Sequence, residues 1–296
     1  MDFEILQFLA APFAISLILT GIHAYLGVHV VERGVIFVDL SLAQIAALGA
    51  TIALLLPFTG HDPHGAATYW LSLGFTFIGA AVFATIRVRR ARIPQEAIIG
   101  ISYAVASAAA ILAMSKATSE SEHLKDMLVG NILAVSWPEV GKTALLYGAV
   151  GAFHYVFRRQ FLTISTDNEK AEAEGLNIRF WDFLFYASFG FVVTSSVAIA
   201  GVLLVFCYLI VPSVAAMLYA DRIGRRLAIG WTMGTVVSAL GIYLSVKLDL
   251  PTGATMVCTF GLVLILMALV RPLVQGRLPR REPGIAAAPS VQKARD

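Results

Sequence analysis

Residues 183–220 read FLFYASFGFVVTSSVAIAGVLLVFCYLIVPSVAAMLYA and contain no charged side chain. A membrane-spanning α-helix needs roughly 20 predominantly apolar residues, so this run is nearly twice as long as one span requires. We therefore divide it near Ala200 and Gly201 into two antiparallel segments. The stretch predicts a helical protein that crosses the membrane several times.

The composition of the whole chain agrees with this interpretation. Of the 296 residues, 58% are hydrophobic and only 14% are charged, with mean hydropathy +0.79 and net charge +3. A soluble globular domain carries about 25% charged residues, so a water-soluble enzyme is excluded. Nine spans would use about 180 positions, which leaves too few for a separate catalytic domain. We expect one all-α polytopic membrane domain over residues 1–274.

Further segments of spanning length precede and follow the long run. Five are uncharged: residues 5–31, 65–86, 97–115, 227–246 and 251–270. Two more carry isolated polar groups: residues 35–57, with Asp39 and Gln44, and residues 137–157, with Glu139 and Lys142 near the start. The expected bundle has nine transmembrane helices, with eight as the nearest alternative.

The first span is expected to remain in the mature protein. It is longer than the core of a signal peptide, and the acidic residues Asp2 and Glu4 stand where such a peptide has positive charge.

The distribution of Lys and Arg predicts the orientation, because cytoplasmic loops hold the excess of these residues. With the N-terminus outside and the C-terminus inside, 18 of the 22 Lys and Arg side chains are cytoplasmic and the other 4 are external. This orientation places residues 61–64, which include two histidines, on the outer face, where a turn is favoured over a cation site. The basic tail, residues 275–296, is expected to be disordered in the cytoplasm.

Motifs of known enzyme classes are missing from the sequence. Gly141-Lys142-Thr143 resembles the end of a phosphate-binding loop, but such a loop also needs a glycine where this chain has Ser136. There is no HExxH motif and no Gly-x-Ser-x-Gly motif. Cys207 and Cys258 both lie in uncharged stretches and support neither a disulfide framework nor a metal site. Transport, a channel or an assembly role remain, without a bound cofactor.

The longest polar piece between spans is residues 158–179, RRQFLTISTDNEKAEAEGLNIR. It combines a capping-type start at Thr166 and Asp167, helix-forming residues through Glu174, and a stop at Gly175. A short surface helix of this kind is either a docking element for a soluble partner or a solvated linker.

Four motifs, in order along the chain, resemble the ABC-3 family, the permease subunits of bacterial ABC transporters for zinc, manganese and iron. The pattern Asp167-x-x-x-Ala171-x-x-x-Gly175 is similar to the family's cytoplasmic signature. The other three are LVGNILAVS (residues 128–136), GVLLVFCYLIVPSVAA (residues 201–216) and LPTGATMV (residues 250–257). The resemblance extends from about residue 31 to residue 270.

This resemblance implies a homodimeric permease in the bacterial inner membrane, surrounded by lipid and without a nucleic-acid partner. It implies that a separate cytoplasmic ATPase binds ATP, and that an extracytoplasmic binding protein delivers the metal. The ATPase would dock on residues 160–180, which we call the docking segment; the implied contact residues are Asp167, Glu169, Ala171, Glu174 and Gly175. The competing hypothesis is a secondary transporter or channel for a cation or small solute that acts without ATP.

The metal path is predicted from polar groups within the spans, because ionisable groups there are costly and mark function. Asp39, Gln44 and the helix-kinking Pro212 are the pathway candidates, and Asp39 and Gln44 are the candidate metal ligands. Many family members have an Asp and a His four residues apart in the second span; here an ungapped alignment puts Leu40 and Gln44 at those positions.

Each of these candidates has an alternative. Asp39 and Gln44 lie five residues apart, some 140° around a helix, so they do not share a face. Gln44 can instead bond a neighbouring helix, and Asp39 can pair with Arg33 or be solvated. Pro212 can be a static kink. His23 and His29, in the first span, are interpreted as packed or interfacial groups.

Overall fold

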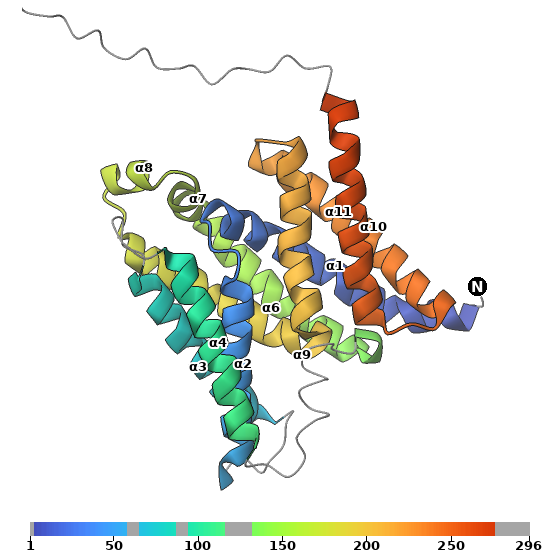
Figure 1. Ribbon diagram of the computed structural model, residues 1–296, viewed down its shortest axis with the longest axis horizontal. Coiled ribbons are helices and arrows are strands. Elements are labelled where there is room, and N and C mark those ends of the chain that lie inside the picture. The colour runs from blue at the N-terminus through green and yellow to red at the C-terminus, as the bar shows by residue number, and fades with distance from the viewer. Residues whose placement is uncertain (1–2, 58–64, 87–93, 116–131, 276–296) are drawn as a thin grey trace, which may run out of the picture.

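The computed structural model describes residues 3–57, 65–86, 94–115 and 132–275, and all the regular secondary structure in these ranges is helical (Figure 1). The expected tail and residues 61–64 lie outside the described residues. The elements are α1 (Phe3–Glu32), α2 (Val38–Leu55), α3 (Ala66–Ile86), α4 (Gln95–Met114), η2 (Ile132–Ala134), α6 (Trp137–Val156), α7 (Arg158–Thr166), α8 (Asn168–Ala173), α9 (Ile178–Tyr219), α10 (Ile223–Leu248) and α11 (Thr252–Gln275).

The all-α membrane fold predicted from the sequence is confirmed. Among the described residues, 7 helices are long and apolar enough to cross a membrane: α1, α2, α3, α4, α9, α10 and α11. Helix α6 has the length of a span, 20 residues, but carries Glu139, Lys142 and His154. Helix α9 has 42 residues and is interrupted. The nine predicted segments thus all appear as helices or as halves of α9.

The interruption of α9 falls at Gly201, as the sequence predicts. Gly201 has φ 75° and ψ 160°, a conformation that an L side chain rarely adopts and that glycine permits. Figure 1 shows the first half of α9, in yellow, running down to this point and the second half, in gold, returning toward the start of α10. The glycine therefore lets one uncharged run form two segments of opposite direction.

Helix α9 forms the centre of the packing. It contacts α1, α2, α3, α10 and α11, while α2 also packs against α3 and α4. The largest fully buried side chains include Tyr186, Phe185, Phe189 and Tyr208, all on α9. Because α9 supplies this aromatic core, the remaining helices are positioned relative to it.

Helix α1 lies close against the backbone of the second half of α9 at Gly27. A Cβ atom added at Gly27 would lie 2.0 Å from the Leu209 carbonyl oxygen. The Ser213 hydroxyl lies at the same crossing, 2.8 Å from the Leu209 carbonyl oxygen and 3.3 Å from the Ala24 carbonyl oxygen. Small residues that let two backbones approach are typical of helix contacts in membranes.

This contact predicts that Gly27→Ala destabilises the protein, because a methyl group cannot be accommodated against the α9 backbone. Overpacking of this kind costs about 1–3 kcal/mol. Gly21→Ala is the matched control, since it lies on the same helix with nothing within 4 Å of the added Cβ. Thermal unfolding in lipid nanodiscs should show a lower midpoint for Gly27→Ala alone; equal midpoints for the two variants would contradict the packing.

Candidate functional site

The docking segment folds as two helices rather than the one expected from the sequence. Asp167, with φ −151° and ψ 88°, ends α7 and caps α8, and its carboxylate accepts a hydrogen bond from the Lys170 N–H at 3.0 Å. Gly175 has φ 71° and follows α8, where the Leu176 N–H donates to the Ala171 carbonyl oxygen at 3.0 Å. The predicted start and stop are therefore both confirmed as local structure.

The two helices present different surfaces. Helix α7 buries Phe161, Ile164 and Ser165 against the membrane domain. Helix α8 buries Ala171, whereas Asp167, Glu169, Glu172 and Glu174 are exposed. Helix α7 thus anchors the segment, and α8 offers an acidic outer surface. Both lie at the upper end of the molecule in Figure 1, away from the turn between α10 and α11.

A buried ion pair fixes the docking segment to the spans. Arg33, which follows α1, donates to the Asp182 carboxylate of α9 at 2.6 Å, and the side chains are 1% and 0% exposed. The Arg33 Nε–H also donates to the Ser165 hydroxyl of α7 at 2.8 Å. We call these three residues the Arg33 junction. Its guanidinium lies 4.0 Å from the Phe185 ring centroid, so α1, α7 and α9 meet at one charge.

A second ion pair joins the same end of the molecule. Arg226 of α10 donates to the Glu32 carboxylate of α1 and, at 2.8 Å, to the Ala220 carbonyl oxygen. The end of α1, the start of α9 and the start of α10 are consequently held on one side, as the order of the predicted spans requires.

Asp39 is neither solvated nor hydrogen-bonded to Arg33, so both alternatives raised for it from the sequence are wrong. Its residue is 1% exposed, because α2 packs against α3, α4 and α9. Arg33 directs its guanidinium to Asp182 instead. Within the described ranges neither carboxylate oxygen of Asp39 has a hydrogen-bond partner. A buried carboxylate in this state needs a compensating cation or proton.

Gln44 and Pro212 do not complete a ligand set with Asp39. Gln44 is only half-buried on α2, and Pro212 is buried in the second half of α9 near Gly230 of α10. No group of three or more His, Cys, Asp or Glu side chains in the described part of the chain is arranged to hold a metal ion. Asp39 is therefore a buried acid without a second acidic or histidine ligand grouped around it in the described residues.

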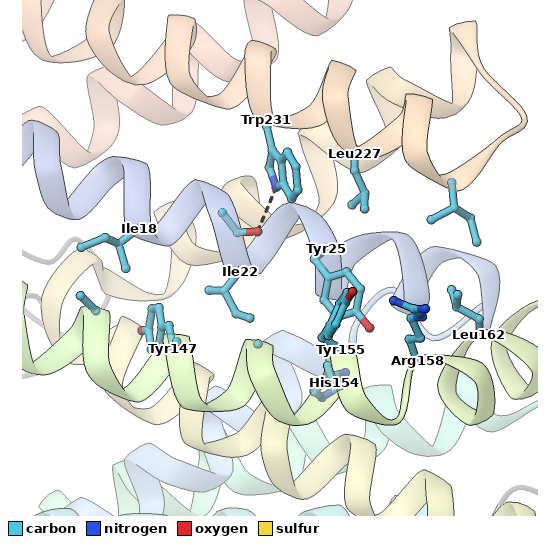
Figure 2. A pocket seen from close by; sticks show the side chains of 15 residues that line it. Ile18, Ile22, Tyr25, Tyr147, His154, Tyr155, Arg158, Leu162, Leu227 and Trp231 are labelled. Carbon is cyan, nitrogen blue, oxygen red and sulfur yellow. Dashed lines mark hydrogen bonds between the residues drawn. The ribbon is translucent and has the colours of Figure 1, made fainter.

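A cavity of about 550 Å³ lies among α1, α6, α7 and α10 (Figure 2). Its walls are mostly apolar. The indole N–H of Trp231, on α10, donates a hydrogen bond to the Gly21 carbonyl oxygen at 3.0 Å. Tyr25 and His154 line it, with ring centroids 5.5 Å apart, and they lie together between α1 and α6 in Figure 2.

Three histidines in the spans take part in polar contacts that the sequence did not reveal. The ring of His23 has partners for both nitrogens, the Leu19 carbonyl oxygen at 2.8 Å and the Ser196 hydroxyl at 3.2 Å. His29 and His154 each contact one serine hydroxyl at 2.8 Å. Because the serine partners come from other helices, no local spacing in the sequence indicates those contacts.

Comparison with known proteins gives a consistent result across the chain. The ABC 3 transport family matches residues 5–271. The manganese transport system membrane protein MntC of Listeria innocua is 30% identical over 217 residues, which cover 71% of this chain and 77% of that protein. The probable iron transport system membrane protein of Haemophilus influenzae is 24% identical over 265 residues and covers 90% of each chain.

A solved structure shares the fold. PsaBC from Streptococcus pneumoniae in complex with Fab superposes with a TM-score of 0.73 at 23% sequence identity. The match covers 88% of this chain and 91% of that chain.

The Arg33 junction predicts a large loss of stability for Asp182→Asn, because this change leaves the Arg33 charge buried without its counter-charge. Breaking one half of a buried pair costs about 3–5 kcal/mol. Arg159→Gln is the control, since its ion pair with Glu174 has an Arg159 side chain that is 78% exposed and should contribute under about 1 kcal/mol. Thermal unfolding measures both, and an unchanged midpoint for Asp182→Asn would contradict the role of the junction.

Proposed function

The chain belongs to the ABC 3 transport family, and from this premise we propose that it is the membrane permease subunit of an ATP-driven importer of divalent metal cations. Two observations together carry the proposal: the family match over residues 5–271, and an acidic surface helix, α8, that adjoins α7, whose Ser165 accepts a hydrogen bond from the buried Arg33. The permease hydrolyses no ATP itself, and a partner ATPase supplies the energy.

The cargo class follows from the relatives. Those reported above carry names for manganese and iron transport, and zinc completes the set expected from the sequence. The metal is a substrate rather than a resident cofactor, so its binding must be reversible. The absence of the family's Asp and His pair in the second span indicates that this chain handles the ion with different groups.

Docking of the ATPase is assigned to α8. Asp167 and Gly175 define its two ends, Ala171 anchors it, and Glu169 and Glu174 lie on its exposed side. Because α7 connects α8 to the Arg33 junction, a displacement of α8 would be passed to α1 and α9 together. This connection provides a route by which closure of two ATPases can change the packing of the spans.

The remaining partners follow from the topology. We place the N-terminus outside and the C-terminus inside the bacterial inner membrane, so that the docking segment faces the cytoplasm and a binding protein delivers metal from the other side. The start of α6 is the proposed contact of a homodimer, because Glu139 and Lys142 are exposed there. Charged groups at this position are unsuited to lipid and would instead face a second copy or the transport path.

Asp39 is the proposed acidic residue of the metal path. Gln44 and Pro212 are proposed as accessory groups on the same path. The buried carboxylate of Asp39 has no hydrogen-bond partner within the ranges the structure describes, so a passing divalent cation would supply the missing positive charge. Pro212 removes one backbone hydrogen bond from α9 and would provide local freedom as the spans rearrange.

Uptake in proteoliposomes tests this function. With its ATPase and binding protein, the chain should accumulate radioactive manganese, iron or zinc only when ATP is supplied, and a hydrolysis-deficient ATPase should abolish accumulation. Uptake by this chain alone, driven by an ion gradient, would contradict the proposal and support a secondary transporter or channel.

The Asp39→Asn variant, measured in the same assay, tests the passage of metal separately from ATP hydrolysis. Removal of the charge should lower uptake at least about tenfold while ATP hydrolysis by the assembled complex persists, because one charged contact to the ion is worth about 1.5–3 kcal/mol. Ser107→Ala is the control, because Ser107 lies on α4, a helix that is mostly exposed, and its hydroxyl bonds only the Tyr103 carbonyl oxygen of the same helix among the described contacts. Equal uptake by Asp39→Asn and wild type would exclude Asp39 from the path.

A further inference from the structure

Three buried polar atoms on α1 and α6 lack hydrogen-bond partners within the described residues: the Tyr25 hydroxyl, His29 Nε2 and His154 Nδ1. The two histidines are each 1% exposed. The Tyr25 ring centroid lies 4.8 Å from that of His29 and 5.5 Å from that of His154, and the two histidine centroids are 6.5 Å apart. Three unpartnered groups thus occur in one cluster.

The hydrogen bonds of Ser165 define which nitrogen of His29 carries the lone pair. A serine hydroxyl has one hydrogen to donate, and that of Ser165 is directed to the Phe161 carbonyl oxygen at 2.8 Å. Ser165 must therefore accept from both Arg33 Nε–H and His29 Nδ1. The Nδ1 atom is then protonated, and in the neutral ring Nε2 has the free lone pair.

His154 is oriented by a serine in the same way. The Ser188 hydroxyl donates to the Phe185 carbonyl oxygen at 2.9 Å, so it accepts from His154 Nε2–H at 2.8 Å. The free lone pair of His154 is consequently on Nδ1. Two serines from two different helices, α7 and α9, therefore orient two imidazoles so that each retains one buried acceptor.

Two lone pairs cannot hydrogen-bond each other, but both can bind one cation. Imidazole nitrogen is a ligand that suits zinc, iron and other first-row transition metals. From this arrangement we infer that His29 Nε2 and His154 Nδ1 form a binding site for a divalent first-row transition metal, with the Tyr25 hydroxyl as a third group. The proposed function is the premise only for treating this ion as cargo.

A shared ion requires the two rings to move slightly toward each other. Metal–nitrogen bonds are about 2.0–2.1 Å, and each nitrogen lies roughly one ångström from its ring centroid, so an ion between the two nitrogens holds the centroids at most about 6 Å apart. The observed separation is 6.5 Å, so the rings approach each other when the ion binds. Tyr25 and His154 also line the cavity of about 550 Å³, which provides an approach to the cluster (Figure 2).

The charges around the cluster favour weak, reversible binding. The positive charge of Arg33 is near His29 but is balanced by Asp182 at 2.6 Å. No carboxylate takes part in the cluster, so the ion would be held by neutral groups. Such a site suits a cation that is released again. Serine hydroxyls take the place of the carboxylates that often orient metal-binding histidines.

The orienting serines also connect this site to the docking segment. Ser165 belongs to α7, so a shift of α7 would remove the partner that holds His29 in its tautomer and orientation. The matched residue on the other ring, Ser188, belongs to α9 and is not part of the docking segment. Binding to this pair would therefore depend on the position of α7.

Titration of the full chain in nanodiscs with Co²⁺, followed by visible absorption, tests the site. The background variant carries His61→Ala, His64→Ala and His123→Ala, so that only His23, His29 and His154 remain among the 6 histidines. We expect saturable binding of one Co²⁺ with imidazole-type spectra. His29→Gln and His154→Gln should each weaken binding at least tenfold, and Ser165→Ala should weaken it about 10–100-fold.

His23→Gln is the matched control, because His23 is equally buried on α1 but both of its nitrogens already have partners. Unchanged thermal midpoints establish that the variants are folded. If a variant does not fold, Zn²⁺ competition against Co²⁺ on the folded background protein provides the second measurement. Absence of Co²⁺ binding by the background protein, or an equal loss in His23→Gln, would overturn the inference.

The site and the proposed function fail in different ways. ATP-dependent uptake with no Co²⁺ binding would reject the histidine site and retain the importer. Co²⁺ binding that depends on His29 and His154, in a chain that shows no ATP-dependent uptake, would retain the site and reject the importer.

Discussion

The buried pair of Arg33 and Asp182 is the interaction on which the arrangement of this end of the molecule depends. Charges removed from water are tolerated only when each is matched, so this pair requires the end of α1 and the start of α9 to remain in contact. Ser165 adds α7 to the same contact through the Arg33 Nε–H. A surface helix that would otherwise be a loosely attached linker is thereby joined to the two most central spans.

The Ser165 contact links the exposed docking segment to the buried part of the molecule. Helix α8 is exposed and acidic, whereas His29, held by Ser165, is buried among the spans. The same serine contacts the ion pair and the histidine. A displacement of α8 would therefore reach His29, the group that we infer to bind a cation, through α7 and its Ser165. Asp39, on α2, belongs to a different part of the packing and would meet the cation separately.

Local features could be predicted from the sequence because they depend on neighbouring residues. The interruption at Gly201 follows from the length of one uncharged run, and the ends of α8 follow from Asp167 and Gly175. The contacts of His29 and His154 could not be predicted. Their partners Ser165 and Ser188 lie on other helices, and no spacing along the sequence relates these serines to the histidines. The same limitation explains Asp39: its proposed partner Arg33 is close in sequence, but the packing of α9 directs Arg33 to Asp182.

The central claim is that α8 is the surface through which an ATPase drives this permease. Site-specific photo-cross-linking tests it most directly, with the reactive side chain placed at Ala173 on α8 or, as a control, at exposed Leu250 in the turn between α10 and α11. The account predicts a covalent adduct with the ATPase from Ala173 and none from Leu250. An adduct from Leu250 would contradict the account. So would the lack of any adduct from Ala173 in a complex that hydrolyses ATP and transports metal.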